Sequence, residues 1–202
     1  MEATLTIGKI AGIVVFLSII PYAVRVYQKK IVANLVSWSV WSLVALALLA
    51  NYDKSGAKDN LWTVIWGTVN PFIVTIVILW RGGIKKVGKF DMWCLVFGIT
   101  SIAIWYYFSA IEMATFGLVM GISADAFAMV PTIRGAYLHP DDDRPMMWGV
   151  FSLGYMISMF SITDHTFSNY VLPLYMVIGA GIVFVILAKY RVKNKTPLRE
   201  WV

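Results

Sequence analysis

Apolar residues fall into seven long runs along the chain, separated by short polar or turn-rich segments. Two of these segments are QKKIVAN after the first run and HPDDDRP after the fifth. A transmembrane helix needs about 20 mostly apolar residues, and its backbone groups must be hydrogen-bonded within the helix. We therefore predict an all-α integral membrane protein with seven transmembrane helices, at roughly residues 5–27, 35–52, 61–80, 92–109, 114–137, 146–162 and 170–190.

The composition agrees with a protein that lies in a lipid bilayer. Of 202 residues, 59% are hydrophobic and 14% are charged, whereas a soluble domain carries roughly a quarter charged residues. The net charge of +6 does not indicate nucleic acid, because the basic residues lie at the ends of apolar runs. The single cysteine, Cys94, excludes an internal disulfide and a cysteine-based metal site. We expect no cleavable signal peptide, since Glu2 rather than a basic region precedes the first run.

A second pattern is an internal repeat. The stretch from Pro21 to Leu43 returns 110 positions later, without a gap, as Pro131 to Leu153. The matched pairs include Pro21–Pro131, Tyr27–Tyr137, Trp38–Trp148, Val40–Val150 and Ser42–Ser152. Chance similarity between two apolar helices is the alternative. Four spans separate the first helix from the fifth, so both run in the same direction and the repeat is parallel. We predict two three-helix units, residues 1–90 and 111–202, joined by a linker helix at residues 91–110.

The distribution of Lys and Arg predicts the orientation. Lys9, Lys54 and Lys58 lie on one side of the predicted bundle, and the other fourteen of the 17 basic residues lie on the opposite side. Loops rich in Lys and Arg face the cytoplasm. We therefore expect a multi-pass protein of the cell membrane with its N-terminus outside and its C-terminus cytoplasmic. Asp141–Asp143 are expected to form a solvated turn, and the tail Lys189–Arg199 an orientation anchor.

The third predicted helix carries a polar residue in line with two tryptophans. Trp62, Trp66 and Asn70 are four residues apart, so they share one helix face. A buried amide in lipid is costly unless it is hydrogen-bonded, so we expect Asn70 to face the bundle interior. There it could bond the hydroxyls or the base edge of a solute while the indole rings cover the solute ring. The alternative is that Asn70 joins two helices and Trp62 anchors at the membrane interface.

Asp125 is the only acid placed well inside an apolar run. An acid at that depth is costly and is a functional candidate for that reason. It could bond solute hydroxyls, offset a positive charge on the solute or take up a proton, and the alternative is a structural bond to a nearby Ser or Trp. Trp41 shares a helix face with Trp38 and either lines the solute path or packs between helices. We include Trp41 among the predicted substrate-binding residues, with Asn70, Trp66, Asp125 and Trp62.

Pro21 and Pro131 lie about two turns before the cytoplasmic ends of their helices. Proline kinks a helix and leaves a weak point in its hydrogen bonding. We predict that both prolines act as hinges, and a static kink is the alternative.

These features resemble the PQ-loop and SWEET-type transporter superfamily. The resemblance rests on Pro21 and Pro131, on the turn after each proline, on a Ser/Trp-rich second helix and on the three-plus-one-plus-three layout. This chain has Tyr22 and Thr132 where the family usually has glutamine. The resemblance implies a central path between two units, solute contacts by asparagine and tryptophan, and prolines that bend to open the cytoplasmic side. Vitamin transporters of the nicotinamide-riboside type share the layout, and the run Trp62–Asn70 loosely resembles their motif.

We therefore predict a transporter that moves a small polar solute by alternating access between two three-helix units. The resemblance implies a mono- or disaccharide, with a vitamin or nucleoside-type solute as the second interpretation. A receptor or trafficking protein of the same fold is the third. We expect no enzyme activity, because Asp125 has no His, Cys or second acid near it in sequence. No cofactor, metal or nucleic acid is expected, and the pattern leaves homo-oligomerisation open.

Overall fold

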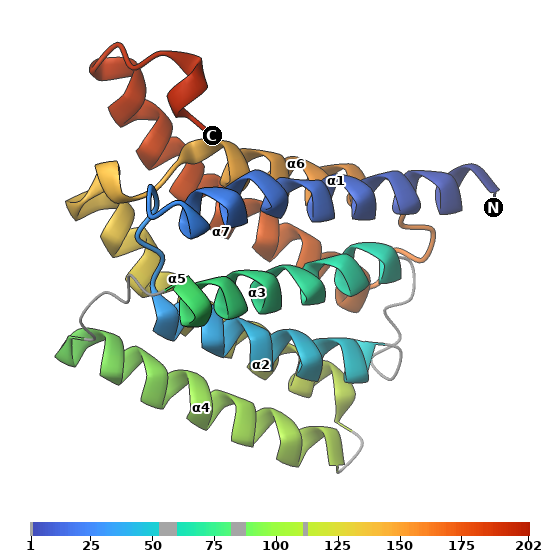
Figure 1. Ribbon diagram of the computed structural model, residues 1–202. Coiled ribbons are helices and arrows are strands. Elements are labelled where there is room, and N and C mark those ends of the chain that lie inside the picture. Colours follow the sequence, from blue (N-terminus) through green and yellow to red (C-terminus); the bar gives the residue numbers. More distant parts are fainter. Residues whose placement is uncertain (1, 53–59, 82–87, 111–112) are drawn as a thin grey trace.

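Seven α-helices lie side by side in the computed structural model, which describes residues 2–52, 60–81, 88–110 and 113–202 (Figure 1). They are α1 (Glu2–Tyr27), α2 (Leu35–Tyr52), α3 (Leu61–Arg81), α4 (Lys89–Ala110), α5 (Ala114–Leu138), α6 (Pro145–Met159) and α7 (Phe167–Lys193). Two 3₁₀ turns, η2 (Pro140–Asp142) and η3 (Leu198–Glu200), complete the described secondary structure. The predicted all-α fold is therefore confirmed.

The helix ends follow the predicted runs to within three residues. The sixth helix is shorter than predicted: it ends at Met159, because the N–H of Phe160 bonds to the carbonyl of Ile157 at 3.1 Å and tightens the last turn. Four of the basic residues counted for the orientation lie outside the described part of the chain, namely Lys54, Lys58, Lys85 and Lys86, and so do residues 111–112 in the break between the fourth and fifth predicted runs.

Five of the described helices, α1, α3, α4, α5 and α7, are long and apolar enough to cross a membrane. The apolar part of α2, Leu35–Ala50, is shorter. The 15 residues of α6 rise about 22 Å, less than a hydrocarbon core of about 30 Å. The protein thus has membrane-span-like helices, and seven complete spans stay a prediction.

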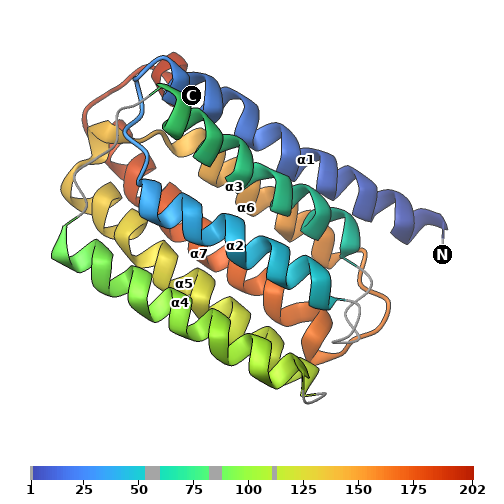
Figure 2. The same ribbon diagram turned by 60° about the horizontal axis from the view of Figure 1, so that its bottom comes forward.

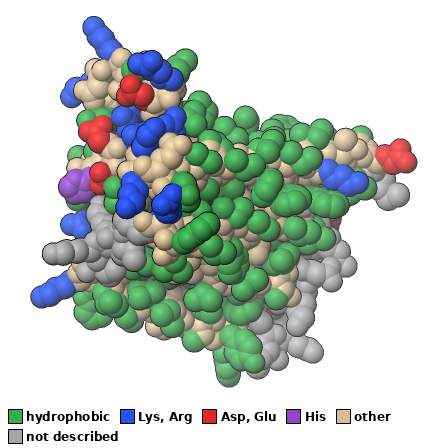
Figure 3. Space-filling view, in the orientation of Figure 1, with side chains coloured by type: hydrophobic (Ala, Val, Ile, Leu, Met, Phe, Trp, Pro, Cys, Tyr) green, Lys and Arg blue, Asp and Glu red, His purple; other side chains and the backbone are tan. Residues whose placement is uncertain are grey.

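Apolar side chains dominate the outer surface. Trp80 on α3 is 77% exposed, and Trp93 and Tyr106 on α4 are 63% and 70% exposed. Figure 3 shows hydrophobic side chains across the middle of the visible face, with Lys and Arg gathered mainly at one end. We call this the basic end; α1, α3, α5 and α7 finish there, and the other is the opposite end. So wide an apolar surface is unusual on a soluble monomer and favours a bundle surrounded by lipid.

The helices pack in the same order in both halves of the chain. Helix α3 lies between α1 and α2, and α7 lies between α5 and α6. We call α1–α3 the first trio and α5–α7 the second trio. The trios meet along two seams, α1 against α6 and α2 against α5, while α4 packs against α5 and α2 (Figure 2). The helices approach closely on the α1–α6 seam. At Gly154 an added Cβ atom would lie only 2.6 Å from the side chain of Val15.

Residues matched by the internal repeat touch each other at two places. The N–H of Val32 donates to the carbonyl of Asp142 at 2.8 Å. The rings of Trp38 and Trp148 have centroids 6.2 Å apart. When two units are related by a twofold rotation, residues beside the axis meet their own counterparts. A rotation relating the two trios would therefore pass between Trp38 and Trp148.

Candidate functional site

A cavity of about 70 Å³ lies between the two trios, near the middle of the helices. Both trios contribute to its lining: Ile19, Trp38, Trp41, Ala45, Leu48, Val64, Gly67, Thr68, Asn70 and Pro71 come from the first, and Asp125, Met129, Met147, Trp148, Phe151 and Met176 from the second. The volume gives room for a few water molecules or a compact solute. A mostly apolar wall with few polar groups is typical of small-molecule sites.

Asn70 brings an amide to this cavity from the middle of α3. Its Nδ2 donates to the carbonyl of Val15 on α1 at 2.9 Å, so the side chain also holds α3 against α1. Only 2% of the residue is exposed, and its Oδ1 accepts no hydrogen bond from the described residues. A buried acceptor without a partner is costly, and a ligand or a water molecule in the cavity would relieve that cost.

Asp125 brings a carboxyl group to the same cavity from the middle of α5. The residue is 6% exposed, and its Oδ2 accepts a hydrogen bond from the hydroxyl of Tyr175 on α7 at 2.7 Å. Trp41 on α2 donates from Nε1 to the backbone carbonyl of Asp125 at 3.2 Å, which joins the two trios. No Lys, Arg or His is found among the described residues that line the cavity.

Aromatic rings separate the cavity from the basic end. Tyr22, Trp38 and Trp148 form a layer with ring centroids 5.4 to 6.3 Å apart, and Trp41 packs against both indoles of this layer. Trp38 also lines a second, more polar cavity of about 30 Å³ nearer the basic end, together with Tyr22 and Asp143. The aromatic layer, defined as Tyr22, Trp38 and Trp148, is thus the partition between the two cavities.

Trp62 and Trp66 lie on the side of α3 that packs along α1, and neither is part of the cavity lining. The ring of Trp66 lies 4.7 Å from that of Phe16, and the Nζ of Lys9 lies 5.6 Å from the ring of Trp62. The four-residue spacing does place both tryptophans in line with Asn70. Of the three, the cavity lining includes only Asn70, so a binding role for Trp62 and Trp66 stays a prediction.

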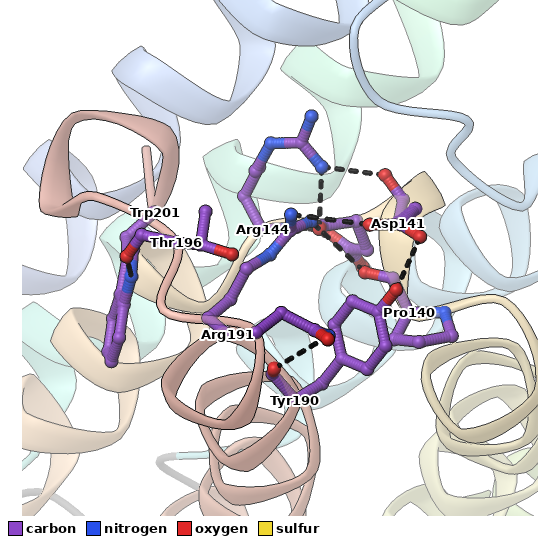
Figure 4. Close-up of polar contacts among 9 residues, drawn as sticks. Pro140, Asp141, Arg144, Tyr190, Arg191, Thr196 and Trp201 are labelled. Atoms are coloured by element: carbon purple, nitrogen blue, oxygen red, sulfur yellow. Dashed lines mark hydrogen bonds and ion pairs between the residues drawn. The ribbon is translucent and has the colours of Figure 1, made fainter.

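Arg191 holds the turn between α5 and α6 at the basic end, although the sequence suggested only an orientation anchor. Its Nη2 donates to the carbonyls of Pro140 and Asp143 at 3.2 and 3.0 Å, and its Nη1 lies 3.4 Å from Oδ1 of Asp141 (Figure 4). Arg144 donates to the carbonyls of Asp141 and Asp143 at 2.6 and 3.0 Å. The expected solvated turn is therefore tied to α7 by an arginine that is only 4% exposed.

Asp143 links this turn to the aromatic layer. Its Oδ2 accepts a hydrogen bond from Nε1 of Trp148 at 3.1 Å, and its Oδ1 accepts one from the N–H of Arg144 at 2.6 Å. Removal from water raises the pKa of Asp143 to about 7, although both hydrogen bonds and the charges of Arg144 and Arg191 act in the other direction. This carboxyl group can therefore change its charge near neutral pH.

A polar cluster separates the cavity from the opposite end. Asn60, just before α3, donates from Nδ2 to the carbonyl of Asn169 on α7 at 3.0 Å, and its Oδ1 lies 3.4 Å from the hydroxyl of Ser161. Between this cluster and the cavity, the hydroxyl of Tyr155 lies 3.4 Å from the carbonyl of Thr63. We call Asn60, Asn169 and Ser161 the amide cluster; all three are buried. Sequence reasoning missed it, although Asn60 and Asn169 stand at nearly matching points of the repeat.

Both predicted hinge prolines lie inside helices, Pro21 in α1 and Pro131 in α5. Pro21 lies one residue before Tyr22 of the aromatic layer, and Pro131 lines the small cavity beside that layer. The structure therefore places both prolines at the level where the central cavity is closed toward the basic end.

Comparisons with known proteins add no relative. No protein-family model matched the chain, and neither a curated protein nor a solved structure matched it. The family resemblance drawn from the sequence stays a prediction, and a proposal of function rests on the residues of this chain.

Proposed function

We propose that the chain is a membrane transporter that moves a small polar solute by alternating access between its two trios. The observation that supports this most is the position of the cavity. It lies between the trios, and its two most polar side chains, Asn70 and Asp125, come one from each. A solute bound there would touch both moving parts, so its binding would depend on how the trios are arranged.

The arrangement of the trios supports a repeated architecture. Both trios place their third helix between the other two. The contacts of Val32 with Asp142 and of Trp38 with Trp148 are those expected beside a twofold axis. We propose two parallel repeats joined by α4, with Pro21 and Pro131 as matched hinges. In this proposal α2 and α6 are the remaining two of seven spans.

The proposal assigns the basic end to the cytoplasm, by the positive-inside rule. His165 is exposed at the opposite end, and Lys195 is exposed at the basic end. In a Cys94→Ala background, His165→Cys should react with an impermeant thiol reagent in intact cells, and Lys195→Cys should react only after lysis. The reverse pattern would overturn this orientation.

The lining favours a solute with an apolar or aromatic face. Asn70, Thr68 and Asp125 are its polar side chains, whereas Trp38, Trp41, Trp148 and Phe151 present rings. A sugar site should offer several amides and hydroxyls, and a vitamin-like site more aromatic stacking. A sugar remains the solute implied by the family resemblance, while this wall agrees better with the vitamin-like alternative.

Solute flux in proteoliposomes tests the proposal. Candidates are first selected by thermal shift of the purified protein against sugars, vitamin precursors and amines, and each one that binds is then followed across the membrane. Asn70→Ala should abolish flux while the protein still folds, and Asn194→Ala, at an exposed asparagine on the basic end, should leave flux unchanged. Binding without any flux would favour a receptor over a transporter, and full flux in Asn70→Ala would remove Asn70 from the site.

A further inference from the structure

The hydrogen-bond donors of the cavity wall are largely used within the protein. The hydroxyl of Thr68 has one proton, which lies within hydrogen-bonding distance of the carbonyls of Val64 and Ala45, at 2.7 and 3.2 Å. The indole N–H of Trp41 donates to the carbonyl of Asp125 at 3.2 Å, and that of Trp148 to the carboxylate of Asp143 at 3.1 Å. These three side chains therefore offer a solute apolar surface rather than donors.

The hydrogen-bond acceptors of the wall are less fully used within the protein than its donors. Oδ1 of Asn70 has no partner among the described residues, because the amide turns its Nδ2 to Val15. The carboxyl group of Asp125 has two oxygens and several acceptor positions; Tyr175 and Trp41 both direct a donor toward it, and part of its acceptor capacity is left. These acceptors belong to residues that line the same cavity, one from each trio, and Oδ1 of Asn70 is itself buried. A solute that complements this wall has to donate hydrogen bonds.

The ionisable group of the wall also favours a solute that donates hydrogen bonds. Asp125 is the one ionisable side chain among the described lining residues. An ionised carboxylate in such a place is costly without a positive partner. The surrounding surface consists of indole rings and of the thioethers of Met129, Met147 and Met176, which are polarisable groups. Tryptophan rings attract cations as well as apolar groups.

We infer that the central cavity binds a compact protonated amine, whose N–H groups donate to Asp125 and to Oδ1 of Asn70 while its carbon body packs against Trp38, Trp41 and Trp148. This inference rests on the proposed solute site and names the chemical class of the solute. A neutral sugar fits less well, because its oxygens would find few free donors in the wall. The positive charge also supplies the cationic partner that the Asp125 carboxyl group does not find among the described lining residues.

Equilibrium binding to the purified protein in lipid nanodiscs tests this inference without requiring transport. Isobutylammonium is compared with isobutanol, which has the same carbon skeleton and no charge, and with tetramethylammonium, which has a charge but no N–H. We expect the ammonium to bind about tenfold to a hundredfold more tightly than either comparison ligand, the range of a charged hydrogen bond. Equal binding of the alcohol, or of tetramethylammonium, would overturn the inference.

Two variants locate the site. Asp125→Asn keeps the shape of the side chain and removes its charge, and it should weaken isobutylammonium binding at least about tenfold while isobutanol binding stays unchanged. Glu200→Gln, at an exposed acid far from the cavity, should bind as the parent does. An unchanged affinity in Asp125→Asn would overturn the inference. If Asp125→Asn does not fold, the comparison of ammonium with alcohol in the parent protein still decides.

The binding experiment can contradict the amine inference, and the flux experiment the transporter proposal, independently of each other. Selective amine binding without flux would leave the site as inferred and remove the transporter proposal. Binding and flux of a neutral solute, with no preference for the ammonium, would keep the transporter and overturn the amine inference.

Discussion

The central cavity is closed by different chemistry at its two ends. Toward the basic end, the rings of the aromatic layer (Tyr22, Trp38 and Trp148) pack against each other, and Asp143 holds Trp148 in place by a hydrogen bond. Toward the opposite end, the amide cluster closes the bundle through buried hydrogen bonds between Asn60, Asn169 and Ser161. One closure is made mainly of apolar area, the other mainly of polar contacts.

The difference indicates how each end would open. Separating packed rings exposes apolar surface to water, at a cost proportional to that surface. Separating hydrogen-bonded amides exposes groups that water can bond in their place, so the net cost is smaller. We therefore expect the opposite end to open more easily than the basic end. Opening the basic end would need bending at Pro21 and Pro131 and the loss of the hydrogen bond between Trp148 and Asp143.

Removing a ring from the aromatic layer should have the largest effect on stability. Trp148 is buried, and Trp148→Ala should lower the free energy of unfolding by about 3–5 kcal/mol, through lost contacts and a residual cavity. The measurement is unfolding in mixed micelles followed by far-UV circular dichroism. Trp93→Ala, on the exposed face of α4, is the matched control and should change far less. Equal losses at the two positions would show that the layer has no special part in the packing.

Breaking the amide cluster should have a smaller effect. Asn60→Ala removes the donor to the Asn169 carbonyl and leaves that buried group unpaired, which should cost about 1–3 kcal/mol. The same unfolding measurement applies, with Asn194→Ala as the exposed control. A loss larger than that of Trp148→Ala would reverse the comparison between the two ends.

Asp143 should make the stability of the basic end depend on pH. Its pKa of about 7 in the folded protein exceeds the value of about 3.9 for an unfolded aspartate, so the folded state holds the proton more tightly. Stability should therefore fall as pH rises from about 4 to 7, by about 1–2 kcal/mol after allowance for partial exposure of the side chain. Asp143→Asn should remove this slope in unfolding measured at several pH values. A slope that persists in Asp143→Asn would assign it to other groups.

The hinge prolines should have the smallest effect on stability and a separate effect on flux. Pro21→Ala with Pro131→Ala restores two backbone donors inside helices, so the free energy of unfolding should change by no more than about 1 kcal/mol. Flux should fall, because the helices lose their weak points. Pro197→Ala, outside the long helices, is the control for both measurements. Unchanged flux in the double variant would leave static kinks as the better interpretation.

The sequence was sufficient to predict the helices because apolar runs and polar breaks alternate clearly along it. Asn70 and Asp125 could be found from the cost of burying polar groups in an apolar run, and both line the cavity. Helical spacing placed Trp62 and Trp66 in line with Asn70, but spacing does not say which neighbouring helix covers that line. Here it is α1.

The network at the basic end could not be predicted from local sequence. Charged residues at a helix end usually lie in water, and Arg191 and Asp141–Asp143 fit that pattern equally well. Their contacts depend on the end of α7 meeting the turn between α5 and α6, which are about 50 positions apart in the chain. Tyr175 was missed for the same reason, since its partner Asp125 lies on another helix. Such contacts follow from tertiary packing alone.

The central claim is that one cavity between the trios opens to each side of the membrane in turn, and thiol labelling of its wall tests this most directly. Ala45 lines the cavity, whereas its neighbour Leu46 is exposed on the outer surface of α2. In a Cys94→Ala background, with oriented vesicles, Ala45→Cys should react with impermeant reagents added from either side, and Leu46→Cys should react from neither. Labelling of Ala45→Cys from one side only, or from neither side, would contradict alternating access.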